Sequence, residues 1–296
     1  MTPLVVSLVV LAVFIVLCFL LGLITQNYSW VDRLWSLLPP LYVLIWLPAY
    51  AHNLRYYIAG SLVILWGIRL TVNFALRGGY AFSWIRGFIG EDYRWEYLRN
   101  RIHNRLLFEV FNFFFISAYQ LLLIFIFTLP LYFYGQIDGP VTGAEIFLYV
   151  MHLALLVLET IADAQQNRFY KRKHESPWSE QKRYQLGFNT FGLWKYSRHP
   201  NYVCEMGQWV VVYLYLVAAS GQWQWSGMGA LLLILLFAGS HIRLTYSSNG
   251  REHHITFPAH SPVRNPSSSW YELFINHGDR STLEIAPLEQ GSTIFL

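Results

Sequence analysis

Long apolar runs separated by short polar segments dominate the hydrophobic pattern of this chain. A bilayer core of roughly 30 Å requires about 20 apolar residues in a helix. Seven runs of about this size occur, at residues 4–24, 34–50, 56–76, 106–134, 144–162, 202–219 and 225–242. The pattern predicts an all-α polytopic membrane protein with about seven transmembrane helices. Pro39 and Pro40 interrupt the short second run, which predicts a kinked or tilted span there.

Composition supports a lipid environment. Only 13% of the 296 residues are charged and 55% are hydrophobic, whereas a soluble domain carries about 25% charged residues. The first run lacks a preceding basic region and a following Ala-x-Ala site, so we interpret it as a span rather than a signal peptide. Cys18 and Cys204 lie in apolar runs, which argues against a disulfide framework. No Lys/Arg-rich block of the nucleic-acid-binding kind occurs, so nucleic acid is not an expected partner.

Basic residues sort between the two sets of loops that seven spans create. The loops 78–105 and 163–200 and the segment after residue 242 are rich in Arg and Lys, whereas 51–55, 135–143 and 220–224 contain only Arg55. The positive-inside rule then predicts the N-terminus outside and the C-terminus in the cytosol. We expect a seven-helix membrane domain over residues 1–244 and a polar, poorly ordered cytosolic tail over 245–296.

The strongest chemical motif is Gly-Leu-Trp-Lys-Tyr-Ser-Arg-His-Pro-Asn-Tyr-Val-Cys-Glu, at residues 192–205. Pro200 suits the first turn of a helix, where free backbone N–H groups attract phosphate or carboxylate. Arg198 and His199 flank this helix start. Asn201 and Glu205 are four residues apart and share a helix face. An alternative is that Arg198 and His199 reach lipid headgroups and the amide caps the helix.

A second candidate set lies where the fifth run meets a basic loop. Glu159, Asp163 and Gln166 share one helix face, and Arg168 follows. Carboxylates there could bind ribose hydroxyls or amides, with the basic residues available for phosphate. Charge pairing at a helix exit is the alternative, and it is favoured slightly by spacing alone.

Ionisable groups within or beside a span are candidates for function. Asp32 precedes the second run, where desolvation would raise its pKa as a proton donor requires. The alternative, favoured by local sequence, is a helix N-cap. Tyr80 could be a second donor, although an interfacial anchor is favoured there. Arg69 lies within the third run and must find a carboxylate or a water-filled cavity.

Four blocks of the chain resemble the membrane steroid 5α-reductase-like family, in particular its domain-of-unknown-function 1295 branch. They are the motif of residues 192–205, Asp32-Arg-Leu-Trp-Ser, Gly90-Glu-Asp-Tyr-Arg-Trp and Asp163-Ala-Gln-Gln, in the same order over roughly residues 30 to 245. The Arg-His-Pro element alone is shared with membrane methyltransferases. The four blocks together are specific.

The resemblance implies a seven-helix fold that holds NADPH between the later spans and the cytosolic loops. It implies cofactor contacts for Asp163, Asn201 and Glu205, and a substrate-polarising role for an acid near Asp32. Hydride would pass from the nicotinamide to the β-carbon of an enone, with Asp32 stabilising the developing enolate. The candidate catalytic residues are Asp32 and Tyr80, and no metal site is expected. The candidate cofactor-binding residues are Glu159, Asp163, Arg168, Arg198, His199, Asn201, Tyr202 and Glu205.

The chain also departs from the family pattern. The tyrosine that partners the acid in steroid reductases has no clear match, and Asn73 lies near its expected place. Cys204 stands where the family usually has Gly, and the Tyr-Pro-x-Tyr ending that completes the cofactor pocket is missing. A steroid substrate therefore does not follow from the resemblance.

We expect an NADPH-dependent reductase of a carbon-carbon double bond in a lipid or sterol-like enone, surrounded by membrane lipids of the endoplasmic reticulum. An S-adenosylmethionine-dependent membrane methyltransferase and a non-catalytic lipid-binding relative are the alternatives. A transporter is disfavoured because no paired halves occur.

Overall fold

The computed structural model describes residues 1–83, 87–88, 90–173, 175, 184 and 188–246. Helices form almost all of its regular structure, with a short antiparallel hairpin between α4 and α5. The first elements are α1 (Pro3–Thr25), α2 (Trp30–Leu34), α3 (Leu38–Trp46), the 3-10 turn η1 (Leu47–Tyr50), α4 (Leu54–Leu76), β1 (Phe82–Ser83) and β2 (Gly87–Phe88). The next are α5 (Tyr93–Arg101), α6 (Arg105–Phe111), the π-helical η2 (Asn112–Tyr119), α7 (Gln120–Tyr134) and α8 (Gly143–Lys173). The last are η4 (Gly192–Lys195), α10 (Pro200–Ser220), η5 (Trp225–Gly227) and α11 (Met228–Tyr246).

The protein is a polytopic α-helical membrane protein. Among the described residues, five helices are long and apolar enough to cross a bilayer: Pro3–Thr25, Leu54–Leu76, Arg105–Tyr134, Gly143–Lys173 and Pro200–Ser220. Two further apolar helices, Leu38–Tyr50 and Trp225–Phe237, are shorter. The outward face of α8 is apolar, as contact with lipid requires, because Phe147 and Val150 are 61% and 62% exposed.

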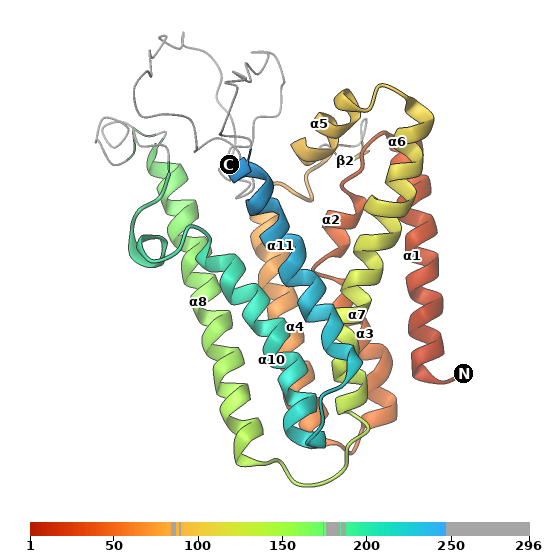
Figure 1. Ribbon diagram of the computed structural model, residues 1–296, viewed down its shortest axis with the longest axis vertical. Coiled ribbons are helices and arrows are strands. Elements are labelled where there is room, and N and C mark those ends of the chain that lie inside the picture. Colours follow the sequence, from red (N-terminus) through yellow and green to blue (C-terminus); the bar gives the residue numbers. More distant parts are fainter. Residues whose placement is uncertain (84–86, 89, 174, 176–183, 185–187, 247–296) are drawn as a thin grey trace.

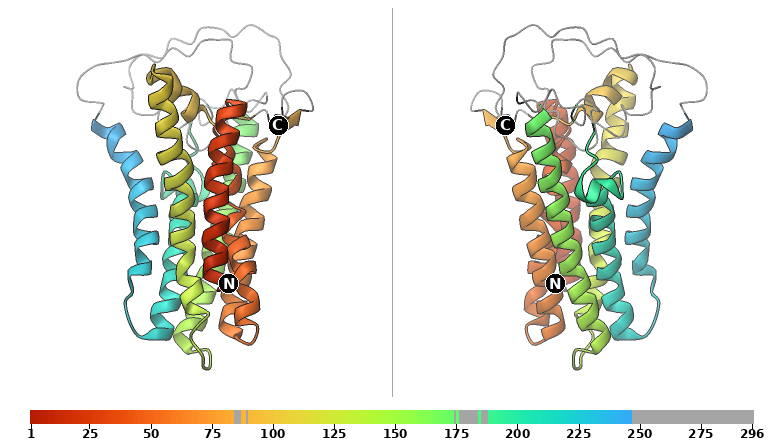
Figure 2. Two further views of the ribbon diagram at one scale, coloured as in Figure 1. Left: turned by 90° about the vertical axis from the view of Figure 1, so that its right-hand side faces the viewer. Right: turned by 90° about the vertical axis from the view of Figure 1, so that its left-hand side faces the viewer.

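The long helices run side by side along the long axis of the molecule (Figures 1 and 2). The strands β1 and β2, α5 and the C-terminal end of α8 lie at one end of the molecule. We call it the basic end because the last turns of α5 and α8 carry Arg99, Arg101, Lys171, Arg172 and Lys173. The N-terminus and the α3–α4, α7–α8 and α10–α11 connections lie at the opposite end. The described parts of the basic loops before and after α5 and at the end of α8 therefore lie at the end opposite to the connections that are poor in charge.

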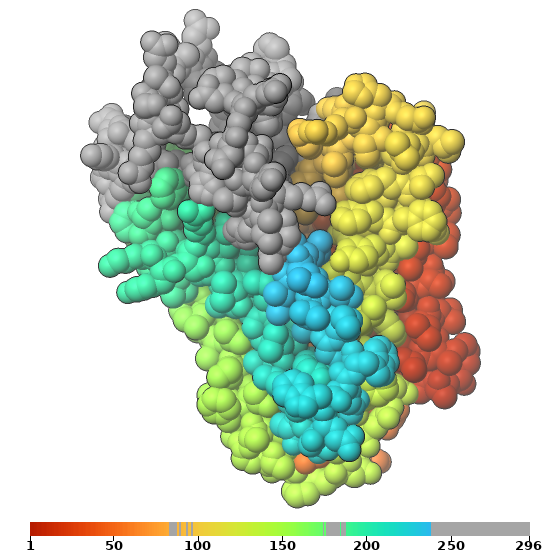
Figure 3. Space-filling model, viewed as in Figure 1, coloured from red at the N-terminus to blue at the C-terminus, as the bar shows by residue number. Residues whose placement is uncertain are grey.

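Neighbouring helices approach closely where glycine replaces a side chain. α10 packs most extensively on α8 and α7, and α11 packs on α7 and α10; the space-filling view shows α11 lying over the bundle, with α1 along its edge (Figure 3). A Cβ at Gly229 of α11 would come 2.4 Å from the backbone nitrogen of Phe127 in α7. A Cβ at Gly67 of α4 would come 2.8 Å from the carbonyl oxygen of Ser36. Both glycines are thus required by backbone proximity.

The second apolar run differs from its predicted form. It does not begin a continuous span at residue 34, because α2 ends at Leu34 and a turn precedes α3. Pro39 lies in the first turn of α3, where a missing N–H disrupts no helical hydrogen bond. The prolines therefore start a helix rather than kink one.

Asp92 caps α5, since its side chain accepts a hydrogen bond from the backbone N–H of Arg94 at 2.9 Å. Two expectations are confirmed or extended. Cys18 and Cys204 are both free and buried. The α8 helix continues to Lys173, past the predicted end at residue 162. The predicted tail over 245–296 lies outside the described residues from residue 247 onward.

Candidate functional site

One face of α8 is polar near the basic end. Glu159, Asp163 and Gln166 are spaced four and three residues apart and share this face, as the sequence predicts. They are 1%, 6% and 1% exposed. Ionised carboxylates inside a membrane protein are costly unless neighbouring helices supply partners.

Cationic and amide partners come from α4. The Arg69 guanidinium lies 2.5 Å from a Glu159 oxygen and 3.2 Å from an Asp163 oxygen. Asn73, one turn further, donates a hydrogen bond to Asp163 at 2.8 Å. Arg77, at the end of α4, lies 3.3 Å from the other Asp163 oxygen. The expectation that Arg69 must find a carboxylate is confirmed, and the charge pairing expected at the exit of α8 is also present.

Further amides come from α10. The Asn201 side chain donates to Asp163 Oδ1 at 3.2 Å. Two turns along the same helix, Gln208 donates to Glu159 Oε2 at 2.7 Å. Two helices distant in sequence, α4 and α10, therefore converge on the carboxylates of α8.

A third carboxylate, Glu205, completes this arrangement. It lies one turn from Asn201 on α10, is 6% exposed, and accepts a hydrogen bond from Trp35 Nε1 at 3.3 Å. Trp35 follows α2, so this bond joins the segment of Asp32 to α10. We call the whole arrangement the carboxylate cluster; its members are Glu159, Asp163, Glu205, Arg69, Arg77, Asn73, Asn201 and Gln208.

The carboxylate cluster contains polar atoms that the described part of the chain leaves without a hydrogen-bond partner. These include Asn201 Oδ1, Gln208 Oε1 and Arg69 Nε. Gln166, on the same face of α8 but outside the cluster, has a buried Oε1 without such a partner too. Buried polar groups are almost always hydrogen-bonded, so each exception requires an explanation. An amide or hydroxyl donor on a bound ligand would satisfy such acceptors.

Candidate phosphate-binding residues lie at the basic end. Arg168 on α8 and Arg198 before α10 are exposed, while His199 is buried at the N-terminus of α10. The His199 ring stacks on Tyr202 with centroids 5.3 Å apart and meets Trp194 edge-on at 6.2 Å. The exposed cations therefore lie at the outer end, while the carboxylates lie deeper between the helices.

Asp32 belongs to a second polar group, between α2 and α5. Its carboxylate accepts a hydrogen bond from Trp95 Nε1 at 2.9 Å and lies 3.4 Å from the Arg94 guanidinium. Burial raises the pKa of Asp32; the nearby Arg94 opposes this shift and Asp92 adds to it. Asp32 sits inside α2, whose N-cap is Ser29, so the N-cap interpretation of Asp32 is wrong.

Tyr80 lies beside this group. Its hydroxyl donates a hydrogen bond to the carbonyl oxygen of Arg33 at 2.7 Å, and burial raises its pKa. Both predicted catalytic residues are thus neighbours of the α2 segment. Of the predicted cofactor-binding residues, the structure brings together Glu159, Asp163, Asn201 and Glu205.

Two polar groups, one half-buried and one buried, were missed from the sequence. Glu109 of α6 accepts hydrogen bonds from the Tyr28 hydroxyl at 2.7 Å and from the Asn112 amide at 3.0 Å, next to the π-helical segment. Its place inside an apolar run was a sufficient signal. At the opposite end of the bundle, Arg55 and Glu145 form an ion pair at 3.0 Å, with side chains 5% and 0% exposed. No local sequence signal joins these two residues.

Comparison with known proteins finds a similar protein and a matching sequence family. The chain is 33% identical over 213 residues to Uncharacterized protein C594.04c of Schizosaccharomyces pombe. This similarity covers 64% of the chain and 58% of that relative, so the chain spans less than two thirds of the relative's length. No solved structure matches the chain.

The family described as Protein of unknown function (DUF1295) matches residues 18–257. This match includes α2, the carboxylate cluster and most of the bundle. The chain therefore belongs to the DUF1295 family.

Proposed function

We propose that this protein is an NADPH-dependent membrane reductase of a carbon-carbon double bond conjugated to a carbonyl group in a lipid or sterol-like molecule. The observation that carries the proposal is the carboxylate cluster, a buried convergence of α4, α8 and α10 directly below the basic end. The resemblance of four sequence blocks to steroid 5α-reductase-like proteins gives the expected chemistry.

Two sets of side chains fit two different parts of a nicotinamide dinucleotide. Carboxylates and amides such as Asp163 and Asn201 suit ribose hydroxyls and a nicotinamide amide, and Asn201 Oδ1 has no partner among the described residues. Exposed cations such as Arg168 and Arg198 suit the phosphates. The carboxylates would repel the phosphates. The nicotinamide and its ribose must therefore bind at the carboxylate cluster, and the phosphates must bind further out along α8 and α10, at the basic end.

Bound NADPH would supply a hydride to the β-carbon of the substrate. The chain's own residues would orient the two reactants and provide the proton that completes the reduction. Asp32 fits a proton donor because burial raises its pKa. Trp35 Nε1 bonds Glu205, so the Asp32 segment is tied to the carboxylate cluster.

Binding of NADPH to purified protein in mild detergent tests this proposal. We expect Glu205→Gln and Asn201→Ala each to weaken NADPH binding by about 10-fold to 100-fold, because hydrogen bonds to a charged group are worth about 1.5–3 kcal/mol. Titration calorimetry gives the affinity, and thermal unfolding shows whether the fold is kept. Gln222→Ala, an exposed amide at the opposite end, is the matched control and should not change binding.

Unchanged NADPH affinity in both variants, with unchanged thermal stability, would show that these residues do not bind the cofactor. Wild-type protein that neither binds NADPH nor releases it on denaturation would refute the reductase proposal. Release of S-adenosylmethionine instead would favour the methyltransferase alternative.

One observation favours a non-catalytic lipid-binding relative as a second candidate. Asp163 already interacts with Arg69, Arg77, Asn73 and Asn201. A network that satisfies its own charges can stabilise a bundle without a ligand. This candidate predicts a folded protein that ignores NADPH, so the same titration separates it from the reductase.

We also propose seven membrane crossings, with Leu38–Tyr50 and Trp225–Phe237 completing the five longer helices, and with the basic end in the cytosol. In sealed endoplasmic-reticulum vesicles with the cytosolic face outward, an impermeant thiol reagent should label Lys195→Cys and Asn100→Cys. Ala51→Cys and Gln222→Cys should react only after the membrane is opened. Free access to residue 51 in sealed vesicles would contradict a crossing by Leu38–Tyr50.

A further inference from the structure

A hollow opens at the end of the bundle opposite the basic end, between the α3–α4 and α7–α8 connections. It has a volume of about 380 Å³, and residues of both connections line it, among them Tyr50, His52, Asn53, Gly135 and Asp138. Ligand pockets in proteins typically have volumes of about 300–1,000 Å³. The hollow is therefore large enough for a small polar group, and it is open to the outside.

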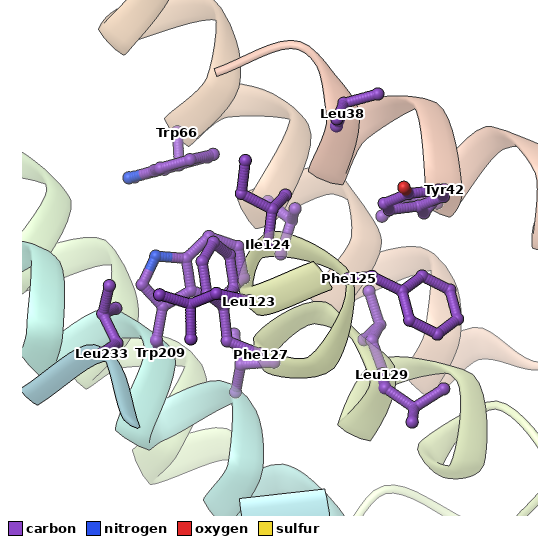
Figure 4. Close-up of a cluster of buried hydrophobic side chains, with 14 of the residues drawn as sticks. Leu38, Tyr42, Trp66, Leu123, Ile124, Phe125, Phe127, Leu129, Trp209 and Leu233 are labelled. Atoms are coloured by element: carbon purple, nitrogen blue, oxygen red, sulfur yellow. The ribbon is translucent and has the colours of Figure 1, made fainter. Parts of the chain in front are cut away.

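Packing contacts and hydrogen bonds hold the walls of the hollow together. The helices α3 and α7 meet through Tyr42 and Phe125, whose ring centroids are 5.2 Å apart with planes at 82° (Figure 4). Across the two connections, the Asn53 amide donates to two backbone carbonyl oxygens after α7, at 3.0 Å each. The Tyr50 ring lies so close to Gly135 that a Cβ there would come 2.5 Å from it. The hollow is therefore formed before any ligand binds.

Two titratable side chains at the hollow have no partner within the described part of the chain. The Asp138 carboxylate and the His52 imidazole are exposed, and they form neither an ion pair nor a side-chain hydrogen bond there. Arg55 is buried nearby and donates to the backbone carbonyl oxygen of Asp138 at 3.4 Å, but its charge is paired with Glu145 at 3.0 Å. The hollow therefore offers one unpaired negative charge and one imidazole to a ligand.

The hollow lies at the level of the lipid headgroups. At the same end, between α10 and α11, Trp223 and Trp225 are 77% and 66% exposed, as is typical of tryptophans at a membrane–water interface. Beside the hollow, Leu44 of α3 and Pro48 of η1 are exposed and four residues apart, and Leu37, seven residues before Leu44, is exposed too. These side chains form an apolar route from the hollow to the hydrocarbon region, so the acyl chains of a lipid need no space inside the bundle.

The charges at the hollow fit a zwitterionic headgroup best. Asp138 would repel a purely anionic headgroup, and a lone cation would leave the imidazole of His52 unused. A headgroup with an ammonium and a phosphate provides a partner for each, because a carboxylate accepts hydrogen bonds and an imidazole N–H donates one. A primary ammonium has three N–H donors, as in lysine, whereas a quaternary ammonium has none and is bound by cages of aromatic rings. A carboxylate with one phenol ring, that of Tyr50, favours the primary ammonium.

We propose that this hollow binds the headgroup of an ethanolamine phospholipid from the leaflet at this end of the bundle. Asp138 accepts hydrogen bonds from the ammonium group, and His52 donates to the phosphate. The acyl chains lie along the exposed face of α3 outside the bundle. The site is separate from the carboxylate cluster and does not depend on the proposed reductase activity.

Titration of the purified full-length protein in mild detergent, followed by native mass spectrometry, tests this site. We expect 1-palmitoyl-2-oleoyl phosphatidylethanolamine to bind about 3-fold to 5-fold more tightly than the matching phosphatidylcholine, the size expected for a solvent-exposed ion pair. Asp138→Asn should remove this preference and Asp138→Glu should keep it. His52→Ala should weaken the binding of both lipids, because both contain the phosphate.

The matched control is Glu175→Gln, which removes the same charge from an exposed side chain after α8, and the preference should persist in it. Thermal unfolding checks that each variant is folded. Equal affinity of the wild-type protein for the two lipids would overturn the proposal, as would a preference that survives in Asp138→Asn. Tighter binding of phosphatidylglycerol than of phosphatidylethanolamine would also overturn it, because an anionic headgroup would then be the ligand.

Discussion

Replacement of Arg69 by methionine is expected to destabilise the protein by about 3–5 kcal/mol, the usual cost of removing one partner from a buried ion pair. The variant keeps the length of the side chain and removes its charge. Glu159 would lose its cation at 2.5 Å and keep only the Gln208 amide as a donor among its described contacts. Domain stabilities are typically 5–15 kcal/mol, so we expect a large loss of folded protein, measured by thermal unfolding and by yield in mild detergent.

A double variant separates charge from packing. Arg69→Met combined with Glu159→Gln removes both charges of the closest pair, and it should recover much of the lost stability because no carboxylate at that position remains unpaired. Arg77 still lies 3.3 Å from Asp163 in this variant. If Arg69→Met alone has wild-type stability, the Arg69–Glu159 pair is not a buried ion pair of the folded protein.

Replacement of Arg55 by methionine is expected to be equally destabilising, at the other end of the bundle. Its partner Glu145 is 0% exposed and also accepts hydrogen bonds from the Tyr134 hydroxyl at 2.6 Å and from the Thr142 backbone at 2.8 Å. Arg55 in addition bonds the carbonyl oxygen of Pro140. Arg55 and Glu145 together thus join α4, α7, α8 and the α7–α8 connection, and the loss of Arg55 should cost about 3–5 kcal/mol in thermal unfolding.

The matched double variant at this end is Arg55→Met with Glu145→Gln. The amide oxygen can still accept from Tyr134, so stability should be partly restored. Its NADPH affinity should equal that of the wild type, because the pair lies at the opposite end from the carboxylate cluster (Figure 1). The Arg69 double variant should bind NADPH more weakly. Equal NADPH binding by the two double variants would argue that the carboxylate cluster is structural.

This comparison distinguishes two uses of buried charge in one bundle. The Arg55–Glu145 pair interacts with several backbone and hydroxyl groups of a helix connection and has the character of a structural clamp. The carboxylate cluster has three carboxylates and two guanidinium groups, and amide oxygens without partners in the described chain. Amide oxygens without a described partner are what the proposed cofactor site requires, because a bound ligand could donate to them.

Properties that depend on neighbouring residues along the chain could be predicted well. Apolar length marked the positions of the helices, and the charge of the loops marked the two ends of the bundle. The 3.6-residue period placed Glu159 with Asp163, and Asn201 with Glu205, on common faces. The Pro39-Pro40 pair did not determine the form of the second apolar run. Pro39 is compatible with both a kink within a helix and a helix start, and the structure has a helix start.

Contacts between helices could not be predicted in the same way. The spacing that puts Asp163 on a face does not say which helix that face meets, and its partners Arg69, Asn73 and Asn201 come from α4 and α10. Such pairings depend on the rotation and depth of each helix against its neighbours, which are set by the packing of the whole core.

The sequence by itself therefore determined an α-helical membrane protein, the approximate positions of its long apolar helices, and which residues share a helix face, because these follow from local periodicity and transfer free energy. Only the tertiary structure decided that Arg69 pairs with Glu159, that Trp35 bonds Glu205, and that the Trp66 and Trp209 rings pack edge-on in the core. These are contacts between residues tens to more than a hundred positions apart, and close packing of the helices alone brings them together.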